Sequence, residues 1–355
     1  MDTNNYSGDS STDLLRHLID KLDLSAVEID NFTEHFKNNH ERLEEIFSLQ
    51  TYKILNSEKE DLLSEHYKLI SEFRGRLFET WKTPLARLDS LLYMCMEIVG
   101  ELRQKHTDSP QPKNNKLNIC TRLHARCVQV GNEISHLLHG GYADGAFARW
   151  RTLHETSATT KFICEGDEDL ATRFLDYQNI FRIDAATKYN KHNELDFDPV
   201  PVDQLAQFEE KKSAILKKYE PQFKLKFGWA RKALGEKVEQ KGRLHFTDIE
   251  KYVGLGFLRN HFSFANQYIH AGIDSIGYKL GTSMSNIDLL LTGPSNEGLI
   301  EPIQCTSLSL IHATTALIEA YPGKDSSIKI SVLWLWHEVL KQEVVDANDA
   351  LQAKG

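Results

Sequence analysis

Apolar side chains recur every three or four residues along most of the chain, which is the spacing of amphipathic α-helices. The first clear stripe consists of Leu14, Leu15, Leu18, Ile19 and Leu22. The same spacing predicts helices at residues 26–50, 57–80, 84–106, 117–139, 142–165, 168–192, 203–218, 222–235, 255–273, 301–321 and 327–350. No segment shows the alternation typical of a β-strand. We therefore expect an all-α fold, a multi-helix bundle with an additional N-terminal helical region.

Capping and breaking residues mark several of the predicted helix boundaries. Ser57 and Glu60 have the spacing of a capping box, in which the two side chains satisfy backbone N–H groups at the start of a helix. Pro84 suits the first turn of the next helix, where its missing N–H is not needed. The pairs Gly140-Gly141 and Gly166-Asp167 separate the three helices predicted between residues 117 and 192.

A polar stretch rich in proline suggests where one domain ends and the next begins. The sequence TDSPQPKNN, residues 107–115, is the clearest linker in the chain. We predict a disordered N-terminus at residues 1–10 and an N-terminal helical bundle at residues 11–106. The linker at residues 107–116 then leads into a main helical domain at residues 117–352.

The composition supports a globular core and argues against a broad surface for nucleic acid. Of 355 residues, 41% are hydrophobic and 10% are aromatic, which is enough to bury a substantial core. The formal net charge of −9 argues against a footprint for duplex DNA, which needs clustered Lys and Arg. A local basic cleft stays possible, because net charge does not describe how the charges are distributed.

The cysteines, the N-terminus and the hydrophobic runs favour a cytoplasmic protein. The five cysteines are odd in number and include no CxxC pair, so we expect buried free thiols in a reducing compartment. The N-terminal sequence MDTNNYSGDSSTD is acidic and polar, unlike a secretory signal. No apolar run approaches the roughly 18 residues of a membrane span. The nearest one, Ile328–Leu340, contains Lys329 and His337. We therefore expect no contact with a membrane.

The predicted helix at residues 255–273 carries a polar stripe. Its members are separated by four, three and four residues, so they share one face of a helix: Arg259, Ser263, Asn266 and His270. An Arg and a His together can hold a phosphate and move a proton near neutral pH. The structural alternative is a polar boundary face in which the histidine is a satisfied core residue.

The predicted helix at residues 142–165 carries a second polar group. Arg151 and Glu155 are four residues apart and can form an ion pair, which on a surface contributes only roughly 0.2–0.5 kcal/mol. Inside a core the same pair would be costly unless its hydrogen bonds were all made. His154 lies beside it, five residues after Arg149.

The next helix carries Asp176 and Tyr177. If Gly166 turns the chain into an antiparallel helical hairpin, both side chains can reach toward Arg151. The alternative is a charged face exposed to solvent.

Motifs for metals and common cofactors are missing from the chain. His136 and His139 resemble half of a helical metal site, but no further Cys, His or acidic motif matches them. There is no Walker loop, GxGxxG, GxSxG or HExxH sequence. We expect neither a metal nor a cofactor.

Three sequence stretches together resemble the bacterial family known as domain of unknown function 5677. They are ARWRTLHE at residues 148–155, DLATRFLDYQ at residues 169–178 and YVGLGFLRNHFSFANQYIHA at residues 252–271. The family's Arg-x3-Glu matches Arg151 and Glu155, and its RFLDY-like element ends here at Tyr177. Its later helix end matches Tyr268 and His270 loosely. Asn266 stands where the family often has a serine. The resemblance covers roughly residues 115–280 and names no reaction.

The helical character and paired polar motifs are also similar to HEPN-type folds, many of which are dimeric RNases of toxin–antitoxin or antiphage systems. The Arg149-x4-His154 spacing occurs in their catalytic motifs, whereas Arg151 and His270 lie far apart in the sequence. Fold analogy alone is a weak guide to activity. The resemblance implies a metal-independent endoribonuclease-like protein of a bacterial defence or toxin system, with RNA as a partner and a homo-oligomer, such as a homodimer, as the assembly.

In that interpretation each candidate residue has a role. Arg151 and Arg259 bind phosphate, and His270 acts as general acid or base with Glu155 orienting it. His154 replaces His270 if the Arg-x4-His spacing is the real motif. The residues that position substrate are Asn266, Tyr177 and Tyr268.

Two alternatives stay open. One is a non-catalytic helical sensor or adaptor whose N-terminal helices bind a protein partner. The other is a protein that binds a small molecule or nucleotide without turnover.

Overall fold

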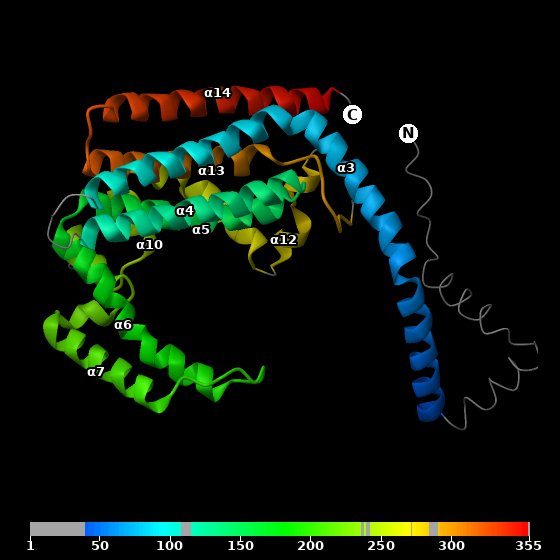
Figure 1. Cartoon of the computed structure of the whole chain (residues 1–355), viewed down its shortest axis with the longest axis horizontal. Coiled ribbons are helices and arrows are strands. Elements are labelled where there is room, and N and C mark those ends of the chain that lie inside the picture. Colours follow the sequence, from blue (N-terminus) through cyan, green and yellow to red (C-terminus); the bar gives the residue numbers. More distant parts are fainter. Residues whose placement is uncertain are drawn as a thin grey trace, which may run out of the picture. The chain divides into compact units, whose positions relative to one another are not determined.

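The computed structural model describes most of the chain as helix. The described residues are 40–107, 115–235, 238, 242–270, 272–283 and 290–353, with side chains described throughout except at 40–47 and 274. These ranges contain helices and no strand, which confirms the all-α prediction (Figure 1). None of the described helices is long and apolar enough to cross a membrane. The chain divides into two compact units, Met1–Phe73 and Arg74–Gly355.

One long helix, α3 (His40–Thr107), runs through the helices predicted at 57–80 and 84–106 and through the end of the one predicted at 26–50. Ser57 does not start a helix, because its hydroxyl donates to the carbonyl of Ile54 at 2.7 Å within α3. Pro84 lies inside the helix, although proline removes one backbone hydrogen bond there. Packing outweighs that loss, since Trp81 and Leu85 on either side are fully buried.

The position of the unit boundary also differs from the predicted domain layout. It falls inside α3, so residues 74–107 belong to the second unit and not to a separate N-terminal bundle. The predicted disordered segment 1–10, the first predicted helix and most of the linker lie outside the described residues.

The core of the second unit is built from long helices close to their predicted bounds. α4 (Asn115–His139), α5 (Ala143–Glu165) and α13 (Ile300–Ala320) pack against one another, and α14 (Ser326–Gln352) packs on α13 (Figure 1). Trp150 of α5 is fully buried, and its indole N–H donates to the Cys305 carbonyl of α13 at 2.8 Å. All five cysteines are free and buried, as expected.

A helical hairpin follows the core helices in sequence. α6 (Glu168–Lys191) begins where Asp167 caps it, because the Asp167 carboxylate accepts from the backbone N–H of Leu170 at 2.8 Å. α7 (Val202–Lys218) packs back along α6. Both helices agree with their predicted ranges.

Two other predicted helices are broken into short pieces. The segment predicted at 222–235 forms η1 (Pro221–Lys224), η2 (Gly228–Ala230) and α8 (Arg231–Leu234). The segment predicted at 255–273 forms η3 (Gly256–Leu258), α11 (Arg259–Ala265) and η4 (Asn266–Tyr268), and α12 (Ile273–Gly277) starts as that segment ends. The polar stripe therefore does not follow one face, because α11 ends before Asn266 and His270.

Backbone conformation explains part of this break. Gly254 has a φ of 75°, a left-handed conformation that favours glycine and turns the chain just before η3. Before that turn, α10 (Phe246–Tyr252) begins at His245, whose backbone N–H donates to Asp248 at 2.9 Å.

The interior of the second unit contains neutral histidines. The Thr314 hydroxyl donates to the Leu310 carbonyl at 2.8 Å, so its oxygen accepts a hydrogen bond from the Nε2–H of the buried His124, 2.9 Å away. Burial lowers the pKa of His124 to about 4. Burial, followed by nearby positive charge, also lowers the pKa of His312 to about 4.

The low pKa values of these buried histidines predict that the folded protein loses stability in acid. The unfolded chain takes up a proton near pH 6.5, whereas folded His124 does so near pH 4, so the stability is complete above pH 6.5 and declines as pH falls toward 4. The contribution of His124 to this loss is roughly 3 kcal/mol. Denaturant unfolding at several pH values should show it. The variant His124→Gln should flatten the pH dependence, whereas His192→Gln at an exposed position should not, and equal slopes in all three proteins would contradict the prediction.

Candidate functional site

Some of the sequence-predicted site residues form two groups, and the first group surrounds a buried carboxylate. Glu250 of α10 accepts from Nε2 of His154 on α5 at 2.8 Å and from Nε of Arg259 on α11 at 2.6 Å. Both His154 and Glu250 are buried, with 0% and 1% of their side chains exposed. We call these three residues the Glu250 cluster.

The negative charge of Glu250 is stabilised by hydrogen-bond donors within the Glu250 cluster. Burial raises the pKa of Glu250, but hydrogen bonds from His154 and Arg259 outweigh burial and hold that pKa below its usual value. Glu250 therefore stays ionised with a donor on each of its two oxygens. Nδ1 of His154 is buried and has no hydrogen-bond partner.

Aromatic side chains surround the buried His154–Glu250 pair of the Glu250 cluster, whereas Arg259 is 28% exposed. The rings of Trp150, Phe246 and Phe262 lie 5.2, 5.8 and 5.6 Å from the His154 ring. The guanidinium groups of Arg259 and Arg151 each lie 4.6 Å from the Phe262 ring. A histidine held by a carboxylate is an arrangement used for proton transfer, but here no substrate atom can reach it.

The neighbouring charged residues have partners of their own. Arg151 pairs with Glu155 at 3.4 Å along α5, with 29% and 44% of these side chains exposed. Nε of Arg151 is nevertheless buried without a partner. Arg149 bonds to Glu133, so the Arg149–His154 spacing does not form a joint site. Glu155 pairs with Arg151 and does not line the cavity that contains His270.

The second group lines a cavity of about 470 Å³. We call it the Tyr268–His270 cavity. Its lining residues are Tyr142, Asp144, Gly145, Tyr268, Ile269, His270, Ser275, Lys279, Leu291, Thr292 and Gly293. They come from the first turn of α5, from the segment after α11 and from the chain before α13. Polar groups that meet in a cavity of this size are typical of a binding site.

Two of its side chains are electrostatically unusual. The Tyr268 hydroxyl is buried and has no hydrogen-bond partner. Burial, followed by the charge of Asp144, raises the pKa of Tyr268, so its phenol stays protonated and can donate. Burial also raises the pKa of Asp144, whose carboxylate accepts from the backbone N–H of Leu280 at 2.7 Å.

The other predicted residues lie elsewhere. The Tyr177 hydroxyl donates to the Leu225 carbonyl at 2.7 Å, and Asp176 pairs with Lys218, so α6 supports the 219–228 segment and does not reach Arg151. The carboxamide oxygen of Asn266 is buried without a partner, outside the Tyr268–His270 cavity.

Metal ligation finds no support in the described part of the chain. His139 bonds to Asp89 at 2.9 Å, and no group of three or more His, Cys, Asp or Glu could hold a metal ion there. The predicted helical half-site at His136 and His139 is therefore not completed by the described residues.

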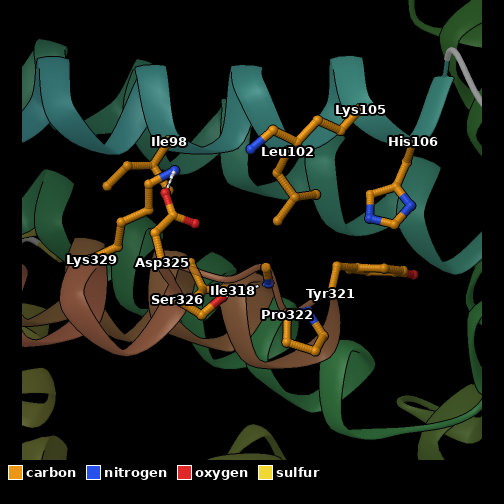
Figure 2. Close-up of a pocket in the computed structure, with 11 residues that line it drawn as sticks. Ile98, Leu102, Lys105, His106, Ile318, Tyr321, Pro322, Asp325, Ser326 and Lys329 are labelled. Carbon is orange, nitrogen blue, oxygen red and sulfur yellow. Dashed lines mark hydrogen bonds and ion pairs between the residues drawn. The ribbon is translucent and has the colours of Figure 1, made fainter.

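A smaller cavity lies between the end of α3 and the start of α14 (Figure 2). It measures about 70 Å³, and two of its charged residues already pair, because Lys329 binds Glu101 at 2.9 Å and Asp325 at 3.0 Å. His106 stacks edge-on against Tyr321. Ligand sites usually measure a few hundred Å³ or more, so this cavity fits water and not a nucleotide.

Glu250, Lys279 and Tyr142 are site residues that the sequence analysis missed. Glu250 lies 96 residues from His154, and no spacing rule connects positions so far apart. Lys279 and Tyr142 lie outside regular helix, where periodicity gives no signal.

The Glu250 cluster predicts a strong asymmetry between two glutamates that both pair with arginine. Glu250→Gln leaves Arg259 and His154 beside an uncharged amide, so the free energy of unfolding should fall by about 3–5 kcal/mol. Glu155→Gln removes a surface pair and should cost at most about 1 kcal/mol. Denaturant unfolding followed by tryptophan fluorescence measures the free energy of unfolding of both variants. Equal losses in the two variants would show that the buried pair contributes no more than the surface pair.

Comparison with known proteins identifies one match. No curated protein and no solved structure matches the chain. The matched segment carries Arg151, Glu155, Tyr177 and Glu250, and it includes His270 from the Tyr268–His270 cavity. Residues 117–287 match the Family of unknown function (DUF5677), in agreement with the resemblance drawn from their motifs.

Proposed function

We propose that the protein is a metal-independent, endoribonuclease-like protein whose site is the Tyr268–His270 cavity. The observation that carries this proposal is the meeting of His270, Lys279 and an unpaired Tyr268 hydroxyl in a cavity of about 470 Å³. A buried hydroxyl without a partner is costly, so a ligand or water oxygen is expected to bind there.

The cavity has several groups that attract a phosphate. Lys279 supplies a positive charge, and Tyr268 supplies a hydrogen-bond donor. The first turn of α5 also lines the cavity, and its N-cap residue Tyr142 makes no side-chain capping bond. The N-terminus of a 23-residue helix favours negative charge, through its free N–H groups and its dipole.

Arg151 favours an RNA strand over a small phosphate. It lies seven residues after Asp144 on the same face of α5, which is about 10 Å along the helix axis. A strand that leaves the cavity along α5 can therefore meet the partly exposed guanidinium groups of Arg151 and Arg259. These arginines then bind the strand beside the reacting phosphate and do not act on it directly.

The proposed reaction is an internal transfer at phosphorus. His270 takes the proton of a ribose 2′-hydroxyl, the 2′-oxygen bonds to phosphorus, and the bond from phosphorus to the 5′-oxygen breaks. The Lys279 ammonium gives a proton to the leaving 5′-oxygen, and Tyr268 donates to a phosphate oxygen as charge builds there. The products are a 2′,3′-cyclic phosphate and a 5′-hydroxyl.

A second candidate is a non-catalytic sensor or adaptor that binds a phosphate-bearing ligand. The sealed Glu250 cluster favours it, because the cluster removes His154 from any chemistry and leaves one imidazole at the cavity. HEPN-type similarity and a role in bacterial defence or as a toxin are part of the first proposal.

The cavity predicts a selective effect of His270→Ala. In the first proposal this change should reduce cleavage of a fluorescent RNA oligonucleotide at least about 100-fold, in the presence of a metal chelator. Lys279→Ala should weaken RNA binding and also slow cleavage, because it removes both a positive charge and the proton donor of the leaving oxygen. Growth arrest on expression should be lost together with cleavage.

His261→Ala is the matched control, because His261 is exposed on α11 and does not line the cavity. Thermal melts of all three variants should stay close to that of the unaltered protein. RNA binding that needs Lys279 without any cleavage would favour the second candidate. Cleavage by His270→Ala at the normal rate would exclude the proposed site.

A further inference from the structure

A row of apolar side chains on α14 is exposed to solvent. We call it the α14 stripe, and its members are Ile328, Val332, Leu335 and Val339, which are 66%, 43%, 65% and 45% exposed. They are separated by four, three and four residues, so they lie on one face of the helix. A contiguous exposed apolar face of this kind is typical of an interaction surface.

A different face of α14 holds the helix in the fold. Leu333, Leu340 and Val344 are fully buried against the unit's core. Arg87 of α3 adds a hydrogen-bonded ion pair with Glu343 at 2.6 Å. Figure 1 shows α14 along the edge of the second unit, with α13 and the C-terminal part of α3 on one side of it. The α14 stripe is therefore not needed to build the unit.

The spacing of the α14 stripe fits contact with another helix. In heptad terms Val332 and Val339 occupy the first core position, and Ile328 and Leu335 occupy the second. Apolar residues at both core positions over about three turns form a seam against which a second helix can pack. The stripe has no charged member, so it fits an equally apolar helix and not a nucleic acid.

We propose that the α14 stripe binds the same stripe of a second copy of this chain, with the two α14 helices antiparallel. A two-fold axis between Val332 and Leu335 then brings Ile328 of one copy against Val339 of the partner subunit. This surface is separate from the Tyr268–His270 cavity, so the inference does not depend on the proposed function.

Charge decides between the two orientations. The same heptad positions continue past the α14 stripe to Asp346 and Asp349, which are both exposed. A parallel pair in register would place each of them against its own copy, and like charges at a helix seam are strongly unfavourable. An antiparallel pair centred on the stripe overlaps at residues 326–341 and leaves both aspartates in solvent.

The length of this overlap sets the expected affinity. Sixteen residues of one helix bury less surface than a standard protein interface, so dissociation in the micromolar range is expected. Analytical ultracentrifugation of the full chain from about 1 to 200 µM covers that range. The unaltered protein should change from monomer to dimer across the series.

Glutamate substitutions test which surface is responsible. The double change Val332→Glu and Leu335→Glu should keep the protein monomeric at every concentration, with an unchanged circular dichroism spectrum. Leu195→Glu is the matched control, because Leu195 is 77% exposed and lies outside α14. A monomeric unaltered protein, or a double variant that still dimerises, would overturn the proposal.

Cysteine crosslinking tests the orientation independently. The five native cysteines are buried, so an introduced surface cysteine is the accessible one among them. A mixture of the Ile328→Cys and Val339→Cys proteins should form a disulfide-linked dimer, and neither should do so alone. In an antiparallel pair the two copies of position 328 are about 16 Å apart along the axis, too far for a disulfide. Crosslinking of Ile328→Cys alone would show a parallel pair and contradict the proposal.

Discussion

The buried carboxylate of Glu250 fixes the position of the segment that forms one side of the candidate site. α10, α11 and the 3-10 turns beside them are too short to be stable as isolated helices, so tertiary contacts must hold them. Glu250 links α10 to α5 through His154 and to α11 through Arg259. Tyr268 and His270 follow directly after α11, so their place beside the start of α5 depends on this link.

The contact with Glu250 also distinguishes His154 from His270, which the sequence alone left as two candidates for the same role. His154 and His270 both have neighbours suited to proton transfer, but His154 is enclosed by aromatic rings and His270 lines a cavity. A buried ion pair with all of its oxygens bonded adds little net stability compared with apolar packing, yet it is expensive to disturb. The Glu250 cluster is therefore well suited to holding helices in position. It is less suited to catalysis, in which a group must change its charge in each turnover.

Long helices could be predicted from the sequence, and the site largely could not. α4, α5, α13 and α14 each carry several turns of regular apolar spacing, so their existence and bounds follow from periodicity. Between residues 255 and 273 the same spacing was misleading, because apolar residues packed by short turns can mimic a helical period. The contact of Glu250 with His154 joins residues 96 positions apart, and only the folded chain brings them together. Tyr177 was placed on the correct helix, but the hairpin directs it toward Leu225.

The wall of the Tyr268–His270 cavity comes partly from outside the family match. Leu291, Thr292 and Gly293 line it, whereas the matched residues end at 287. This wall is attached to the turn before α5, since the backbone N–H of Ser295 donates to the Gly141 carbonyl at 2.9 Å. Proteins that share the matched segment can thus keep Tyr268 and His270 while differing in the irregular segment that borders them. The shape of the cavity can therefore diverge through a short surface segment, without any change to the matched helices.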